Sequence, residues 1–355
     1  MSSLSIILKV VDYCNFRCDF CRYTLQANTS PKKMNIDLAK MCVHKAAMHN
    51  ISQGKNFLHI IFHGGEPLLW EKKNYEKIFE FEKYLKKEFP DFFFFNSIQT
   101  NASLLDQDIA MLFLENDVDI GISIDGPEKI NFHKNADTGV DIFSKINMLN
   151  DLKCNYGILS VITNSHKGCA KEYYEFIKAN KIKSVGLCYC FDPIGNFSID
   201  NEILSDFLIE LFDLYFFGTY KFRIREFDGV ITKCLGHQTH NCNFRCREAC
   251  GNYFSIFPNG EVHFCDAYEY KGYSLGNIIK SDFSQILASD TLNTILSSLV
   301  KNYNNNCKSC PILNLCGGGC FRNDMQNGKN YFCKSYLKTY THIEKIVNQY
   351  KKDKV

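Results

Sequence analysis

"SIILKVVDYCNFRCDFC", residues 5–21, joins an apolar run to three closely spaced cysteines. Cys14, Cys18 and Cys21 follow the run with C-x3-C-x2-C spacing. Four thiolates would complete a tetrahedral zinc site or fully ligate an iron–sulfur cluster. Three leave one metal position open for a ligand, which is the arrangement of a reactive metal centre. The stretch therefore predicts a buried strand that ends in a metal site with one open position.

The composition is that of a globular protein with a sizeable core. The 355 residues are 45% hydrophobic and 23% charged, enough for one large domain and a smaller one. The net charge is only +2, which predicts no nucleic-acid partner. Residues 204–220 form the longest apolar stretch, but they include Asp206, Glu210 and Asp213. These acids predict an amphipathic helix, so we expect no membrane partner.

Eighteen cysteines are many for such a chain. The first residues have no charged segment ahead of the apolar run, so we expect no signal peptide and a cytoplasmic location. Thiols stay reduced in that compartment, and clustered cysteines there favour metal binding over disulfides.

Strand-like and helix-like segments alternate over the first half of the chain. Near-continuous apolar strands that alternate with helices indicate a parallel sheet covered by helices. Six repeats fit an α/β fold with a partial (β/α)6 barrel better than a closed barrel of eight. The consecutive phenylalanines Phe92 to Phe95 are expected to be a buried strand. The predicted strands are residues 5–11, 57–63, 92–99, 119–124, 157–163 and 184–190, and the predicted helices lie near 35–53, 73–89, 105–116, 140–153, 168–180 and 201–217.

The last third of the chain differs in character. After about residue 235 the cysteines become dense, the hydrophobic periodicity fades and turn sequences dominate. Metal is the expected stabiliser of a region with so little regular structure. We therefore divide the chain into a βα core at 1–195, a bridging helical segment at 196–235 and a cysteine-rich domain at 236–355. A helix near 334–350 closes it.

Polar motifs follow the predicted strands in the order of the chain. "FHGGEP" (62–67) ends the second strand, "SIQTNA" (97–102) the third and "SIDGP" (123–127) the fourth. Each alone could be an ordinary turn. Together with the three cysteines they resemble the radical S-adenosylmethionine (radical SAM) superfamily. The resemblance implies SAM contacts from Phe20, Gly64, Gly65, Glu66, Gln99, Asn101, Ser123 and Asp125.

The same resemblance implies the chemistry. Cys14, Cys18 and Cys21 would hold a 4Fe–4S cluster whose fourth iron binds SAM, and an external electron donor such as flavodoxin or ferredoxin would reduce it. Reductive cleavage of SAM would give a 5′-deoxyadenosyl radical. One departure concerns the arginine that many relatives have after the DGP turn. "EKINFHKNADTG" (128–139) has none, so this contact to the SAM carboxylate is in doubt.

The C-terminal cysteines resemble the SPASM extension of this superfamily, which binds two auxiliary 4Fe–4S clusters. A zinc ribbon, the simpler interpretation, would leave several of the cysteines without a role. Relatives suggest one cluster on Cys250, Cys265, Cys320 and an upstream cysteine. Cys246 is our first choice for the upstream ligand, and Cys242 is the alternative. The other cluster would use Cys307, Cys310, Cys316 and Cys333.

Over nearly its whole length the chain resembles anaerobic sulfatase-maturating enzymes. In these an aspartate at the position of Asp266 takes the substrate proton, a role that a raised pKa would suit. These enzymes have glutamine where this chain has His63, and "HGGEPLL" (63–69) is closer to radical SAM maturases of ribosomally made peptides. His63 would either contact substrate or cap the strand.

The predicted function is radical oxidation of a side chain, by cross-linking or dehydrogenation, in a ribosomally made peptide or a protein. The alternatives are a sulfatase-type maturase that makes formylglycine and a small-molecule radical SAM dehydrogenase. A cysteine-rich zinc scaffold is the non-enzymatic alternative, and it would be colourless where an iron–sulfur protein is brown.

Overall fold

The computed structural model describes most of the chain. The described residues are 3–21, 32–131, 141–191, 198–239, 242, 250–266, 274–320, 322–323 and 329–353. The chain forms two compact units. The first comprises Met1–Ser123, His133–Tyr156 and Gly251–Leu296, and the second Ile124–Phe132, Gly157–Cys250 and Ser297–Val355. These units follow compactness, whereas the boundaries at 195 and 235 follow motifs and stay a prediction.

The sheet of the first unit is built around four parallel strands. They are β1 (Ser5–Val11), β2 (Phe57–Gly64), β3 (Phe93–Thr100) and β4 (Val118–Ser123), paired in that order. Three short strands, absent from the sequence prediction, extend the sheet beyond β1. These are β8 (Tyr253–Ile256), parallel to β1, then the antiparallel β9 (Glu261–Phe264) and β10 (Ser274–Asn277).

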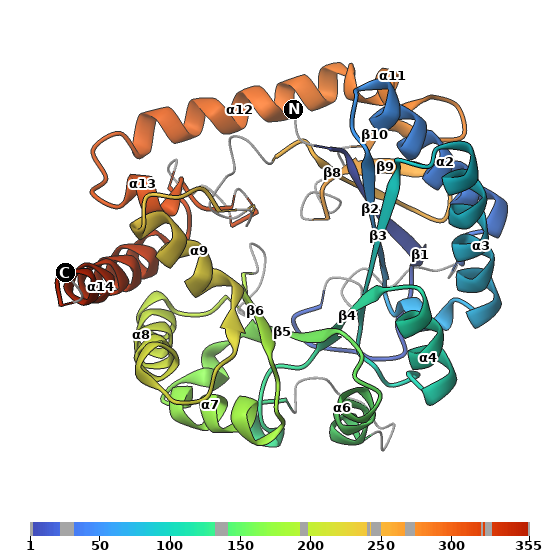
Figure 1. The fold of residues 1–355 in the computed structure, drawn as a ribbon. Helices are drawn as coiled ribbons and strands as arrows, with labels where there is room; N and C mark the ends of the chain where they lie inside the picture. Colours follow the sequence, from blue (N-terminus) through green and yellow to red (C-terminus); the bar gives the residue numbers. More distant parts are fainter. Residues whose placement is uncertain are drawn as a thin grey trace. The chain divides into compact units, whose positions relative to one another are not determined.

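Helices cover one side of this sheet. Figure 1 shows α2 (Ile36–Ser52), α3 (Lys72–Glu88) and α4 (Gln107–Glu115) on the same side of β1 to β4. The N-caps of α2 and α4 are short polar residues, as helix starts prefer. Asn35 accepts a hydrogen bond from Asp37 N, and Asp106 accepts one from Ile109 N. The unit also contains η1 (Pro67–Leu69), α6 (Ile142–Asp151) and α11 (Phe283–Leu287), and α12 (Asp290–Asn306) follows.

Burial alternates along β2 and β3. On β2 the buried Phe62 packs against Trp70 and Tyr75 on the helical side, with ring centroids at 6.4 and 5.2 Å. On β3 the expectation of a fully buried strand is wrong: Phe92 is 4% exposed, but Phe93 and Phe95 are 45% and 56% exposed. Successive strand residues point to opposite faces, and in the described residues the helices cover only one of them.

The second unit combines three short parallel strands with a helical layer. The strands are β5 (Tyr156–Ile162), β6 (Ser184–Tyr189) and β7 (Arg223–Ile224), paired in that order. The helices include α8 (Asn201–Phe217), which begins and ends where predicted. Among the described residues, no helix is both long and apolar enough to cross a membrane. The other helical elements are α5 (Glu128–Asn131), η3 (Asn164–His166), α7 (Ala170–Ala179), α9 (Arg225–Cys234), α13 (Leu313–Cys316) and α14 (Cys333–Lys352).

The acids in the apolar stretch of α8 have partners on the C-terminal helix α14. Asp206 accepts from Lys338 Nζ at 2.6 Å, and Asp213 Oδ1 lies 2.7 Å from His342 Nε2. The opposite stripe of α8, which includes Leu204, Leu208 and Leu211, is buried. The predicted amphipathic pattern is therefore confirmed. The predicted α/β class, with a cysteine-rich region and a closing helix, is confirmed as well.

Candidate active site and cluster-binding cysteines

The glycine-rich loop after β2 lies directly against the chain that leads into Cys14. Gly65 N donates to Val11 O and Glu66 N donates to Tyr13 O, both at 3.0 Å. A Cβ on Gly65 would lie 1.9 Å from Tyr13 O. Only glycine permits this approach, because a real Cβ cannot come within 3 Å of a backbone oxygen. The loop therefore fixes the backbone just ahead of the first cysteine.

Glu66 connects this loop to the end of β3. Its side chain is buried, and Oε1 accepts from Leu68 N at 2.9 Å and from Thr100 Oγ1 at 2.6 Å. Oε2 accepts from Asn101 N at 2.7 Å. Burial raises the pKa of Glu66, and these three hydrogen bonds oppose that rise. The carboxylate predicted to receive the SAM amino group thus also organises the third strand end.

Asn101 lies beside the first cysteine of the motif. Its Nδ2 donates to Asn15 Oδ1 at 3.0 Å and to Cys14 Sγ at 3.7 Å. Cys14 Sγ also accepts from Phe16 N at 3.3 Å. Burial raises the pKa of the Cys14 thiol to about 11, and Cys21 acts in the same direction. A cation that binds this sulfur would therefore have to displace its proton.

The rest of the cysteine motif forms a tight turn. Cys21 N donates to Cys18 O at 2.9 Å, and all three thiols are partly buried. Phe20 is partly exposed within this turn. In the part of the chain that the structure describes, no three His, Cys, Asp or Glu side chains already form a metal-binding set. The motif is thus placed by its backbone, whereas the thiols are not yet converged on one point.

The predicted residues at the ends of β3 and β4 have different surroundings. Gln99 Nε2 donates to Ser123 Oγ at 2.8 Å, so these two side chains lie together in the first unit. Asp125 belongs to the second unit, where it is buried and accepts from Val161 N at 2.9 Å. Its backbone carbonyl lies 2.9 Å from His166 Nε2. The observed contacts of Asp125 therefore join the turn after β4 to β5 and η3.

Lys9, His63 and Asp266 form a second polar group near the end of β1. The sequence had indicated His63 and Asp266 as functional candidates, but not Lys9. Lys9 and His63 are register partners on β1 and β2, and Lys9 Nζ lies 3.4 Å from His63 Nδ1. Lys9 also forms an ion pair with Asp266. The Lys9 side chain is fully buried, and that of Asp266 is 37% exposed. Burial, together with the charge of Lys9, lowers the pKa of His63 to about 4, so His63 is neutral at pH 7.

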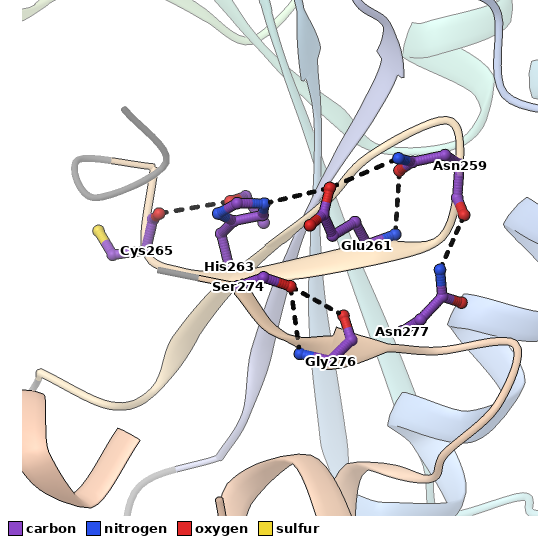
Figure 2. Close-up of polar contacts among 8 residues, drawn as sticks. Asn259, Glu261, His263, Cys265, Ser274, Gly276 and Asn277 are labelled. Carbon is purple, nitrogen blue, oxygen red and sulfur yellow. Dashed lines mark hydrogen bonds and ion pairs between the residues drawn. The ribbon is translucent and has the colours of Figure 1, made fainter. Parts of the chain in front are cut away.

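Asp266 is directed toward Lys9 by an unusual backbone at Cys265. This cysteine has a φ of 54°, in the left-handed region that few residues other than glycine adopt. Its N–H donates to Tyr253 O at 2.9 Å, and its carbonyl accepts from Ser255 Oγ at 3.3 Å. Figure 2 shows Cys265 at the end of β9, with its thiol pointing away from the β9–β10 hairpin.

The hairpin behind Cys265 is held by polar contacts of its own. Asn277 Nδ2 donates to Asn259 O at 3.0 Å, and Glu261 N donates to Asn259 Oδ1 at 3.1 Å. His263 Nε2 lies 3.7 Å from Glu261 Oε2 (Figure 2). These contacts give Cys265 and Asp266 a fixed base within the first unit.

Four of the C-terminal cysteines form one group in the second unit. Burial raises the pKa of Cys316 to about 12, and Cys333, Cys307 and Cys310 contribute in the same direction. Mutual electrostatic effects of this kind require the sulfurs to be near one another. The grouping matches the four cysteines predicted to share one cluster, and the assignment of ligands stays a prediction.

A second group of thiols surrounds Cys320. Burial raises the pKa of Cys320 to about 12, and the neighbouring Cys242 and Cys250 add to the rise. Cys246, our first choice for the upstream ligand, lies outside the described residues. Cys265 belongs to the first unit. Among the described residues, Cys242 is therefore the upstream cysteine that accompanies Cys250 and Cys320.

Comparisons with known proteins agree with these motifs. Residues 8–177 match the model of the radical SAM superfamily, and residues 246–311 match the SPASM iron–sulfur cluster-binding domain. A cysteine-type anaerobic sulfatase-maturating enzyme of Clostridium novyi is 32% identical, over 95% of this chain and 94% of the relative. The chain belongs to the radical SAM superfamily, in the group of the anaerobic sulfatase-maturating enzymes.

Solved structures of this superfamily share the fold. The structure of anSMEcpe with bound AdoMet and Cp18Cys peptide is 25% identical and has a TM-score of 0.84, over 98% of this chain and 99% of that one. Streptococcus suis SuiB bound to S-adenosylmethionine is 18% identical, with a TM-score of 0.62 over 93% of this chain and 77% of SuiB. At that identity the SuiB match shows the fold alone.

As a radical SAM/SPASM enzyme, the protein uses SAM and multiple 4Fe–4S clusters. The donor set fits this requirement, because three partly buried thiols follow β1 and two further groups of thiols occur in the second unit. Iron–sulfur clusters are held by cysteine thiolates of this kind. Cys14, Cys18 and Cys21 would hold the cluster that binds SAM.

Sequence analysis missed Lys9 in the first unit. Thr100 is one of the polar residues of the quoted "SIQTNA" motif, and its hydroxyl donates to Glu66. Lys9 is the partner of Asp266, and its signal was a lysine in the middle of the apolar run "SIILKVV". A charged residue at a buried strand position is unusual and needs a partner.

Proposed function

We propose that this radical SAM enzyme oxidises a cysteine side chain in a peptide or protein to the aldehyde of formylglycine. The observation that carries the proposal is Asp266. By the resemblance to the maturases it corresponds to their base, it pairs with the buried Lys9, and it keeps 37% of its side chain exposed. The similarity to a cysteine-type maturase over 95% of the chain supports cysteine as the target.

The bound groups would supply the redox chemistry: SAM cleaved at its 4Fe–4S cluster provides the acceptor of a hydrogen atom, and an auxiliary cluster accepts one electron. Removal of a hydrogen atom from the cysteine Cβ leaves a carbon radical. Loss of the thiol proton to Asp266 and of one electron then gives a thioaldehyde. Water replaces the sulfur, which leaves an aldehyde and hydrogen sulfide.

The chain's own residues would position these reactants. Gly64 and Gly65 let the loop lie directly against the backbone of Val11 and Tyr13, and Glu66 and Asn101 fix the strand end beside Cys14. Asp266 would accept the proton within reach of the same strand ends of the first unit. Such placement of a base typically contributes about 10²–10⁴-fold to a rate.

His63 supports a second candidate, oxidative cross-linking or dehydrogenation of a ribosomally made peptide. It replaces the glutamine of sulfatase maturases, and "HGGEPLL" resembles the peptide maturases. In the structure His63 contacts Lys9 and the backbone of Gly64. That contact accounts for His63 without a role in substrate choice, so the sulfatase-type reaction is our first proposal.

The test uses the anaerobically reconstituted enzyme with SAM, dithionite and matched peptides that carry cysteine, serine or alanine at one position. We expect an aldehyde from the cysteine peptide, detected by mass spectrometry and hydrazide trapping, and no product from the alanine peptide. A product that keeps its sulfur and gains a cross-link would favour the second candidate and refute the first.

The matched variant is Asp266→Asn, which keeps the shape of the side chain but removes its basicity. Product formation should fall by about 10²–10⁴-fold. Formation of 5′-deoxyadenosine should continue, because it precedes proton removal. Deuterium from a Cβ-labelled peptide should still reach the deoxyadenosine. Product formation at the wild-type rate would exclude Asp266 as the base.

A further inference from the structure

We propose that Lys9 is a positioning residue, which holds the Asp266 carboxylate in the orientation that proton removal requires. This inference rests on the proposed function, because it assigns a role to Lys9 only through Asp266. It adds a residue from the first strand of the fold to a site otherwise defined by loops.

The environment of Lys9 sets the first constraint. It lies in the middle of β1, where every residue is buried, and its own side chain is fully buried. An ammonium group in such a place is costly unless it is paired and hydrogen-bonded. Its ion pair with Asp266 supplies this partner. The pair therefore fixes the position of Asp266 relative to β1.

His63 supplies the second constraint. Gly64 N donates to His63 Nδ1 at 2.7 Å, so Nδ1 is the unprotonated nitrogen of a neutral ring. Lys9 Nζ lies 3.4 Å from the same atom. The acceptors of Lys9 thus include a neutral ring nitrogen on β2 and the charged carboxylate of Asp266. This arrangement gives the histidine at position 63 a role within the fold, as a hydrogen-bond acceptor.

The backbone supplies the third constraint. Cys265 is held in its left-handed conformation by Tyr253 and Ser255 of β8. This turn brings Asp266 back toward β1, where its carboxylate pairs with Lys9 while 37% of its side chain stays exposed. A reacting group misplaced by about 1 Å can lose about 10²-fold in rate. Loss of the Lys9 anchor is therefore expected to reduce proton removal, and hydrogen abstraction should persist.

The test compares Lys9→Met, Lys9→Arg, Asp266→Asn and the double variant Lys9→Met/Asp266→Asn. The readout is the ratio of aldehyde product to 5′-deoxyadenosine, with iron content and KM for the peptide measured in parallel. Lys9→Met should lower the ratio by about 10–100-fold at unchanged iron content and KM. Lys9→Arg, which keeps the charge and a donor, should restore part of the loss.

The double variant is decisive. If Lys9 acts only through Asp266, the double variant should be no worse than Asp266→Asn alone. Independent, multiplying effects would overturn the inference, as would an unchanged ratio in Lys9→Met. Lys9→Gln, which keeps a donor without the charge, replaces Lys9→Met if that protein does not fold, and the same outcomes apply.

Lys45 is the matched control. It forms a lysine–aspartate pair with Asp282 at 2.9 Å in the same unit, and this pair is more exposed than that of Lys9. Lys45→Met should leave the ratio unchanged, and a similar fall there would attribute the Lys9 effect to general destabilisation. A wild-type enzyme that makes no aldehyde would refute the proposed function. The inference alone fails if the wild type makes aldehyde and Lys9→Met makes it at the same ratio.

Discussion

The loop at the end of β2 and the cysteine-rich turns of residues 307–333 both lie beside cysteines that are predicted to bind iron, but they are built differently. At the first, backbone hydrogen bonds tie Gly65 and Glu66 to the residues ahead of Cys14, and the Glu66 carboxylate accepts three more. At the second, the described cysteines occur in short turns and at the start of α14.

The groups that affect the pKa of the thiols also differ between the two regions. At Cys316, burial and then the neighbouring thiols Cys333, Cys307 and Cys310 raise the pKa and disfavour ionisation. Cys14 has amide donors from Phe16 and Asn101 that favour its thiolate. The backbone ahead of Cys14 is fixed by hydrogen bonds of the protein itself, whereas we expect the turns of residues 307–333 to depend more on bound metal for their stability.

Removal of each cysteine set is the strongest test of this comparison. Alanine at Cys307, Cys310, Cys316 and Cys333 should remove about four irons and destabilise the second unit, because metal binding in such regions contributes on the order of 10 kcal/mol. Alanine at Cys14, Cys18 and Cys21 should also remove about four irons. It should abolish SAM cleavage but change the melting temperature little.

Iron analysis, 5′-deoxyadenosine formation and thermal denaturation would measure these outcomes. A C-terminal variant that lost its iron and still melted like the wild type would contradict the comparison. A colourless protein that contains zinc in place of iron would contradict the premise that both regions bind iron–sulfur clusters.

The Gly65→Ala variant tests the organised site alone. Its Cβ would lie 1.9 Å from Tyr13 O, so the loop must separate from the strand end, at a cost of about 1–3 kcal/mol or more. SAM cleavage should fall as Cys14 loses its fixed backbone. Gly54→Ala is the control, since Gly54 has a φ of +67° and open space around it. It should cost about 1–2 kcal/mol and leave SAM cleavage intact. Equal losses of activity in both variants would argue against a specific role of the loop.

Two buried glutamates sharpen the comparison through pH. Glu66 accepts three hydrogen bonds, whereas Glu82 accepts one, from Asn96 Nδ2 at 2.8 Å. Oε1 of Glu82 has no partner among the described residues. Burial raises the pKa of Glu82 to about 8. The folded state therefore binds more protons than the unfolded state, so stability should fall as pH rises from about 4.5 to about 8.

Glu82→Gln should remove this dependence and raise the free energy of unfolding at pH 8 by on the order of 1–3 kcal/mol. Glu66→Gln should instead destabilise the protein, because an amide nitrogen cannot accept the hydrogen bonds made by Thr100 or Asn101. Urea denaturation at pH 5 and pH 8 measures both. An unchanged pH dependence in Glu82→Gln would show that another group is responsible.

Most residues of the first site could be predicted from the sequence, but few of the contacts that hold them in place could. The motifs at the ends of β1, β2 and β3 were recognisable because parallel strands bring their carboxyl ends to one edge. Lys9 is a single charged residue in an apolar run, and its partner Asp266 lies 257 positions away in the sequence. The pairing depends on the left-handed backbone at Cys265, which no residue preference indicates.

Two other features of the fold could not be predicted from the hydrophobic pattern. Residues 92–95 are all phenylalanine, so the sequence does not show which of them face the helices. The structure shows that Phe92 is buried and that Phe93 and Phe95 are exposed. The strands β8, β9 and β10 have four residues each, too few to show a period. Helices with long amphipathic patterns, such as α8, were predicted to the residue.

The hydrogen bonds from Gly65 and Glu66 to the segment before Cys14 also bear on how the enzyme is matured in the cell. A folded, metal-free chain would already present Cys14 in place, so a carrier protein could deliver this cluster after synthesis is complete. The turns of residues 307–333 would have to receive their iron while the region folds. Delivery of clusters to the C-terminal region would then come before delivery to Cys14, Cys18 and Cys21.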